Sequence, residues 1–119
     1  MSRTRHYRDL IAWQKAMDLA RQMYACTEEF PNSETFGLRM QLRRSAVVVA
    51  THIADGHGRL TDAEMRKGLS AARGSLNELQ TQTELAGSLR FMDENTAGRL
   101  LELSIEVAKL INGLLGSLQ

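Results

Sequence analysis

The sequence predicts an all-α protein, an antiparallel four-helix bundle with up-down-up-down topology. Apolar residues recur at steps of three and four through four long segments, as they do along one face of a helix. The only proline, Pro31, lies between the first two segments, and the short connections favour antiparallel neighbours. With 43% apolar and 24% charged residues, the composition is that of a globular chain. We expect one domain over residues 9–119, preceded by a basic arm at residues 1–8.

The first helix is expected over residues 9–30. Asp9 is a suitable cap for its start. Pro31 should end it, because the residue before a proline is driven out of helical geometry. The predicted inner face consists of Leu10, Trp13, Met17, Ala20, Tyr24 and Thr27.

The second helix is expected over residues 33–56, with Asn32 or Ser33 as its cap and Gly56 and Gly58 at its end. The β-branched run at residues 46–50 favours a strand in isolation. We predict a helix, because the 3.6-residue period extends on both sides of that run. The predicted inner stripe consists of Leu38, Leu42, Ser45, Val49 and Ile53.

The third helix, expected over residues 62–89, opens with a capping box formed by Thr61 and Glu64. Gly68 and Gly74 lie inside it at a cost of about 1 kcal/mol each relative to alanine. These glycines indicate that a neighbouring helix packs very closely, with a kink or a functional notch as the alternative. The predicted core heptad consists of Met65, Leu69, Ala72, Leu76, Leu79, Thr83 and Ala86.

The fourth helix is expected over residues 94–117, with Asp93 as its cap. One apolar stripe consists of Leu100, Leu103, Val107, Leu110 and Leu114. A second consists of Leu101, Ile105, Ala108, Ile111, Leu115 and Leu118. A bundle core consumes one stripe, so the second predicts burial against another chain and hence a homo-oligomer.

Positive charge is concentrated in the first half of the chain, although 15 basic and 14 acidic residues give a net charge of only +1. Clustered arginines bind phosphates without sequence specificity. We therefore predict non-specific contacts to DNA, RNA or a ribonucleoprotein. The candidate contacts are Arg39, Arg43, Arg44 and Arg59, assisted by Arg3, Arg5 and Arg8.

The alternative is a structural scaffold or a module that binds a protein partner. In that case the arginines form solvated faces or salt bridges. Arg43 and Arg44 would then be salt-bridge partners within the oligomer, and their replacement would disturb assembly or stability.

No motif predicts catalysis, a metal or a cofactor. His52, Asp55 and His57 cluster, but their spacing matches no metal motif, and we assign them no role. The glycine loop that ends in Arg59 lacks the strand of a nucleotide-binding motif. Cys26 is the only cysteine, which indicates a reducing compartment. With no signal peptide and no apolar run of about 18 residues, we predict a cytoplasmic protein without membrane contact.

Ordered motifs extend along nearly the whole chain. They comprise residues 7–17, Phe30-Pro31 with Glu34, Phe36-Gly37-Leu38, Gln41-Leu42-Arg43-Arg44-Ser45-Ala46, Ile53-Ala54-Asp55-Gly56, Gly58-Arg59, Gly74-Ser75-Leu76 and Glu78-Leu79. In this order they resemble the opening, central and third-helix signatures of one bacterial four-helix-bundle family. Its members are encoded in intervening sequences of large-subunit ribosomal RNA genes and elsewhere in genomes. The chain departs from the family at His52 and Asp55, where Asn and Glu are more usual.

The resemblance implies a bundle that assembles into a homo-oligomeric ring, in some relatives a pentamer. The family also includes the accessory protein of diversity-generating retroelements, its variability determinant. That relative forms a basic barrel that binds nucleic acid and a reverse transcriptase. For most other members the function is unknown.

Overall fold

The computed structural model of the protein describes residues 6–118, which fold into four α-helices and two 3₁₀ turns without a strand. The helices are α1 (Ile11–Cys26), α2 (Leu38–His57), α3 (Asp62–Ser88) and α4 (Glu94–Gly116). The turns are η1 (Tyr7–Asp9) and η2 (Asn32–Glu34). The prediction of an all-α protein with four helices is therefore confirmed.

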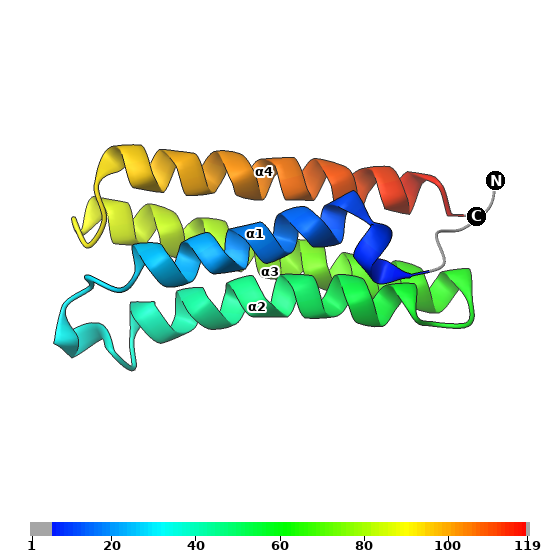
Figure 1. Ribbon diagram of the computed structural model, residues 1–119, viewed down its shortest axis with the longest axis horizontal. Helices are drawn as coiled ribbons and strands as arrows, with labels where there is room; N and C mark the ends of the chain where they lie inside the picture. The colour runs from blue at the N-terminus through cyan, green and yellow to red at the C-terminus, as the bar shows by residue number, and fades with distance from the viewer. Residues whose placement is uncertain (1–5, 119) are drawn as a thin grey trace.

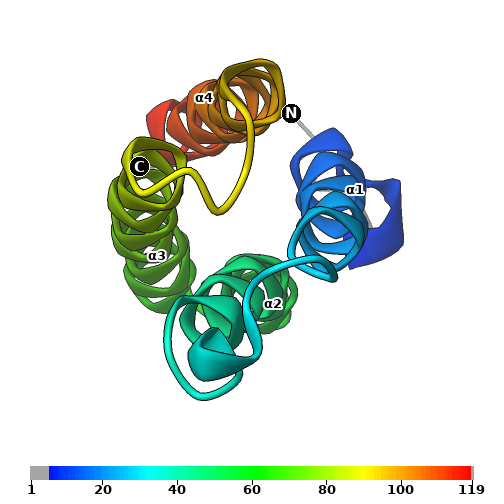
Figure 2. The ribbon, with the colours of Figure 1, turned by 90° about the vertical axis from the view of Figure 1, so that its left-hand side faces the viewer.

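Each helix packs beside two others around one shared core. Figure 1 shows α1 and α3 running in one direction and α2 and α4 in the other. In the end-on view of Figure 2 the four helices surround the bundle axis in chain order, with α1 next to α4. The long axis measures 47 Å, and none of the helices described is long and apolar enough to cross a membrane.

The inner faces of α2 and α3 match the sequence prediction. Every residue of the two predicted stripes is buried, from Leu38 to Ile53 on α2 and from Met65 to Ala86 on α3. The β-branched run at residues 46–50 is helical throughout, because Val49 and its neighbours on the same face contribute to a continuous apolar core.

The inner face of the first helix was predicted only in part. Leu10, Ala20 and Thr27 are buried as expected, but the rest of the predicted face is rotated from the core by about one residue. Trp13 and Met17 are only half-buried, and Tyr24 is 47% exposed. A parallel series of mostly small residues faces the core, which lets α1 approach its neighbours closely. The buried residues of α1 are Ala12, Ala16, Leu19, Ala20 and Met23.

Both apolar stripes of α4 are used inside the single bundle. Arg99 Nε donates to Gln22 Oε1 of α1 at 3.3 Å on one side. On the other side of α4, Arg73 Nη1 of α3 donates to Asn112 Oδ1 at 2.9 Å. Of the predicted second stripe only Ile105 is classed as exposed, at 47%. The other residues of that stripe are half-buried except Ile111, which is buried, because one helix between two neighbours covers part of a wide apolar face. The homo-oligomer stays a prediction.

Two of the predicted helix starts have the expected caps. The Thr61 hydroxyl accepts from Glu64 N at 3.2 Å, and the Asp93 carboxylate accepts from Thr96 N at 2.7 Å. The latter bond lowers the pKa of Asp93, because it stabilises the charged carboxylate.

The caps predicted for the first two helices were wrong. Leu10, rather than Asp9, precedes α1, and it makes no side-chain capping bond. Residues 32–34 form the separate turn η2 instead of starting α2. The cap of α2 comes from Glu34, whose carboxylate accepts from Leu38 N at 2.9 Å.

Candidate interaction surfaces

Arg39 ties the start of α2 to the end of α1. Its Nε donates to Thr27 O at 3.1 Å, and its Nη2 donates to Glu28 O at 3.3 Å and to Phe30 O. The last carbonyls of a helix lack partners within that helix and carry the negative end of its dipole. The guanidinium of Arg39 therefore supplies hydrogen-bond donors to the carbonyl groups of the connection that follows α1.

Arg43 reinforces the same connection one turn later. Its Nε donates to Thr27 Oγ1 at 2.8 Å, and its Nη2 donates to Tyr24 O at 3.1 Å. The same Nη2 lies 3.0 Å from Glu28 Oε2, and the guanidinium carbon lies 4.6 Å from the centre of the Tyr24 ring. Two of the predicted phosphate contacts, Arg39 and Arg43, thus use their donors within the chain (Figure 1 shows the two helices that they join).

The other predicted arginines do not gather around them. Arg59, beyond the far end of α2, lies 3.0 Å from Asp55 Oδ2 and 3.9 Å from Glu64 Oε2. The hydrogen bond and charge of Asp55 raise the pKa of Arg59. Arg44 is exposed and makes no ion pair with any residue from 6 to 118.

Three predicted contacts belong to the N-terminal arm. Arg8 is exposed, with its guanidinium carbon 5.4 Å from the centre of the Tyr7 ring. Arg3 and Arg5 lie outside the described residues.

Two polar clefts of about 440 and 430 Å³ follow the junction of α2 and α3. Within them, Ser45 Oγ donates to Gln82 Oε1 at 2.9 Å. Three basic residues (Arg44, Arg59, Lys67) and three acidic ones (Asp55, Glu64, Glu78) line the pair of clefts. Because these charges cancel, the clefts do not form a positive channel for phosphates.

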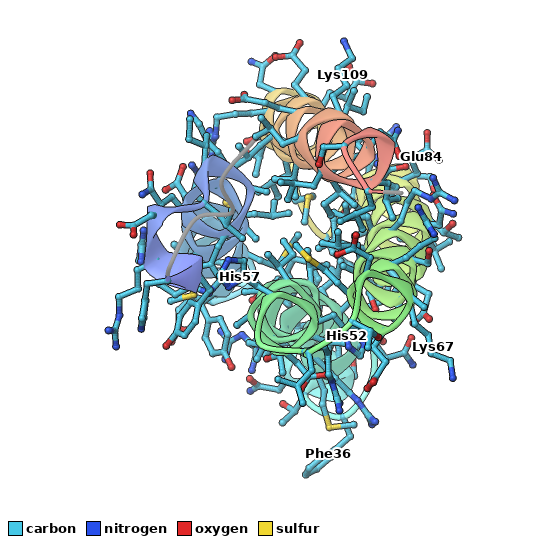
Figure 3. The ribbon with its side chains drawn as sticks, turned by 90° about the vertical axis from the view of Figure 1, so that its right-hand side faces the viewer. Phe36, His52, His57, Lys67, Glu84 and Lys109 are labelled. Atoms are coloured by element: carbon cyan, nitrogen blue, oxygen red, sulfur yellow. The ribbon has the colours of Figure 1, made fainter. Side chains whose placement is uncertain are left out.

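His52, Asp55 and His57 do not converge on one point. His52 lines both α2–α3 clefts, whereas His57 is buried. Figure 3 shows the two histidines on different sides of α2, with His57 toward α1. Asp55 is paired with Arg59. Among residues 6–118, no three His, Cys, Asp or Glu side chains are arranged to hold a metal ion.

An apolar groove of about 560 Å³ follows the junction of α1 and α2. Trp13 and Met17 line it from α1, and Val47, which is 42% exposed, lines it from α2. Tyr7 also lines it, with its ring 5.2 Å from that of Trp13 in an edge-on arrangement. The remaining lining residues are Ala20, Ala50, Thr51, Ala54 and Asp55.

The sequence prediction missed this groove because it placed Trp13, Met17 and Tyr24 in the core. The available signal was the second apolar series on the first helix, Ala12, Ala16, Leu19 and Met23, offset by one residue. Two adjacent series on one helix imply that one of them lies at the edge of the core.

Four exposed apolar side chains, which we call the end patch, belong to the end of the bundle where α2 begins and α3 ends. Figure 1 shows these two helix ends at the same end of the bundle. The end patch comprises Phe36, Met40, Leu85 and Leu89, which are 82%, 48%, 47% and 50% exposed. Figure 3 shows Phe36 projecting away from the bundle. These side chains leave apolar area in water that burial against a partner would remove.

Residues 8–113 match the model of the 23S rRNA-intervening sequence protein family. The fold is similar to the crystal structure of a protein of unknown function from the S23 ribosomal protein family of Bacteroides thetaiotaomicron VPI-5482. That likeness has a TM-score of 0.81 and covers 90% of this chain and 100% of the other, at 17% sequence identity. At this identity it shows the fold alone. No curated protein matches the chain.

Proposed function

The chain belongs to the 23S rRNA-intervening sequence protein family, and we propose that it is a non-enzymatic scaffold that assembles with copies of itself. The observation that carries this proposal is the end patch, where Phe36, Met40, Leu85 and Leu89 are all exposed. Burying apolar area stabilises association by about 25 cal/mol per Å² before the entropic costs of binding. Four such residues at one end of the bundle therefore favour a contact between chains.

The assembled form that we propose is a closed ring, with five copies as the number that the family resemblance implies. A ring joins two different surfaces of each subunit, so every contact in it uses the same pair of surfaces. If the end patch is one of these surfaces, a substitution within it disrupts all contacts of the ring at once.

Light scattering on the purified protein tests this proposal. Five chains of 13.3 kDa would give about 67 kDa, and replacing Leu85 and Leu89 together by Asp should return the mass to that of one chain. Thr81→Asp is the matched control, because Thr81 is an exposed residue of α3 outside the patch. A wild-type protein that stays monomeric at every concentration would rule out the scaffold.

A second candidate function is non-specific binding of nucleic acid or a ribonucleoprotein through arginines. The observation in its favour is that Arg8 and Arg44 are exposed and have no ion pair within residues 6–118. These two side chains are the available phosphate contacts among the described candidates. Arg39, Arg43 and Arg59 would first have to leave the partners that they have in the folded chain.

Binding to short DNA and RNA duplexes across a salt series tests this candidate. Two phosphate contacts per subunit predict a slope of log affinity against log salt near −1.8, at about 0.9 per contact. Replacing Arg8 and Arg44 together by Ala should flatten the slope. Absence of binding at about 50 mM salt would eliminate nucleic acid as a partner.

A further inference from the structure

We propose that the apolar groove between α1 and α2 receives an amphipathic helix of another protein, with acidic residues flanking the apolar stripe of that helix. The groove shares no lining residue with the end patch, so this proposal does not rest on the self-assembly proposed above. It rests on three features of the groove: its shape, the charges around it and the absence of a matching helix on a second copy.

The groove has the shape of a helix-binding site. Ala20 lines it from α1, and Ala50 and Ala54 line it from α2, which leaves room between the helices. The larger Trp13 and Met17 rise along one side and Val47 along the other. Apolar residues repeat on each wall at steps of three and four, the spacing into which the ridges of another helix fit. From Trp13 to Tyr24 the α1 wall extends for eleven residues, about 16 Å, or three turns of a partner helix.

The residues of the groove are of the types that carry binding energy. Aromatic residues and methionine are enriched in protein interfaces, and methionine adapts to the shape of its partner. Trp13 and Met17 are half-buried, so a partner would cover the remaining part of each side chain. Tyr24, under the Arg43 guanidinium, continues the α1 wall beyond Ala20.

The uncompensated charge around the groove is positive. Arg21 lies one turn beyond Met17 on α1. Arg44, which also lines the α2–α3 cleft, lies one turn before Val47 on α2; both arginines are exposed. Arg8 lies over the ring of Tyr7, which lines the groove. None of these three arginines has an ion pair within the described part of the chain.

The acidic side chains near the groove do not fully neutralise this positive charge. Asp55 is paired with Arg59 and Glu28 with Arg43, both at 3.0 Å. Counting Asp9 beside Arg8 and Glu78 in the cleft that Arg44 lines, three positive charges minus two negative leave +1. A helix with glutamates or aspartates along its flanks complements that charge, whereas a basic helix is repelled.

Among residues 6–118, a second copy of the chain offers little exposed apolar surface on its acidic helix, α4. The apolar stripes of α4 pack partly against its own bundle: Leu100, Val107 and Ile111 are buried, and the others apart from Ile105 are half-buried. Of the larger apolar residues of α4, only Ile105 is classed as exposed. One isoleucine cannot supply the three-turn stripe that the groove accommodates, so we assign the site to another protein.

Trp13, the only tryptophan of the chain, allows direct observation of the groove. The probe is a synthetic helix-forming peptide of about 18 residues, long enough to form a helix, with a leucine stripe, glutamate flanks and no tryptophan. The matched probe has lysine flanks. We expect the acidic peptide to shift Trp13 emission to shorter wavelength and to bind at least about tenfold more tightly than the basic peptide. That preference should shrink as salt screens the charges.

Variants locate the binding. Val47→Asp should weaken binding of the acidic peptide at least about tenfold. Arg44→Glu together with Arg21→Glu should reverse the preference for acidic flanks. Thr81→Asp, on the outer face of α3, should leave binding unchanged. Helical circular dichroism establishes that each variant is folded.

Three results would overturn the proposal. Equal binding of the two peptides contradicts the charge argument, and an unchanged Trp13 emission excludes the groove as the site. If Val47→Asp lowers the mass of an oligomer in light scattering, the groove is instead a contact between copies. Loss of assembly on replacing Leu85 and Leu89 reports on the end patch alone, so failure of one proposal is separable from failure of the other.

Discussion

Gly68 of α3 lies directly against Gly56 of α2. A methyl group at position 68 would lie 2.6 Å from the Gly56 Cα, nearer than van der Waals contact permits. The Gly56 Cα belongs to helical backbone, which cannot move aside as a flexible side chain can. The close approach that the sequence predicted from the glycines of the third helix is therefore confirmed at Gly68. The prediction is wrong for Gly74, which is exposed, and a methyl group there would meet no atom of a neighbouring helix within 4 Å.

Alanine substitutions at these two glycines should have opposite effects. Gly68→Ala should lower the free energy of unfolding by about 1–3 kcal/mol, because the helices must separate at their contact. Gly74→Ala should raise it by up to about 1 kcal/mol through helix propensity alone. Urea denaturation of the two variants measures the difference. An unchanged stability for Gly68→Ala would mean that α2 and α3 are less closely packed than described.

Arg43→Ala should destabilise the protein, because it removes bonds to Thr27, Tyr24 and Glu28. The expected loss in the free energy of unfolding is about 1–3 kcal/mol for hydrogen bonds that involve a charged donor. Its neighbour Arg44 is exposed and has no such partners, so Arg44→Ala should change stability by less than about 0.5 kcal/mol. Comparable losses in both variants would argue against a structural role specific to Arg43.

Arg90→Gly should stabilise the protein. Arg90 has φ 63°, the left-handed conformation that ends many helices and that glycine adopts without strain. Its amide donates to Gly87 O at 3.0 Å, and the next amide, that of Phe91, donates to Ala86 O at 2.9 Å. Relief of the strain should raise the free energy of unfolding by about 1 kcal/mol. Thermal denaturation checks this, and a lower melting temperature would contradict it.

The cap of α4 should make stability depend on pH. The pKa of Asp93 is lowered in the folded chain by its hydrogen bond from Thr96 N, so folding favours the charged carboxylate. That contribution is present above the unfolded pKa of about 3.9 and is lost as pH falls through the folded pKa. Asp93→Asn keeps a capping oxygen, so it should remove part of the stability loss below about pH 5. Identical pH profiles of stability for the wild-type protein and Asp93→Asn would show that Asp93 contributes nothing to the pH dependence.

Much of the fold follows from periodicity. The inner faces of α2 and α3 are continuous apolar stripes with no competing series beside them, so their burial was predictable residue by residue. On α1 and α4 two apolar series lie side by side. Periodicity alone does not say which series faces the core and which faces a neighbouring helix or solvent.

The candidate surfaces were less predictable, because side chains from distant positions create them. Arg39, Arg43 and Arg44 look alike in the sequence. Only the packing of α1 against α2 brings the first two onto the carbonyls that follow α1 while Arg44 remains exposed. The α1–α2 groove likewise requires the relative rotation of two helices, which no local pattern specifies.

By itself the sequence determined that the chain is helical, where α3 and α4 begin and which faces of α2 and α3 are buried. Those features depend on residues within a few turns of one another, such as Thr61 with Glu64 and Asp93 with Thr96. The tertiary structure decided which arginines are engaged, how closely Gly56 and Gly68 approach and where apolar side chains remain in water. The physical reason is that these properties depend on the distance and rotation between helices, which the core as a whole fixes.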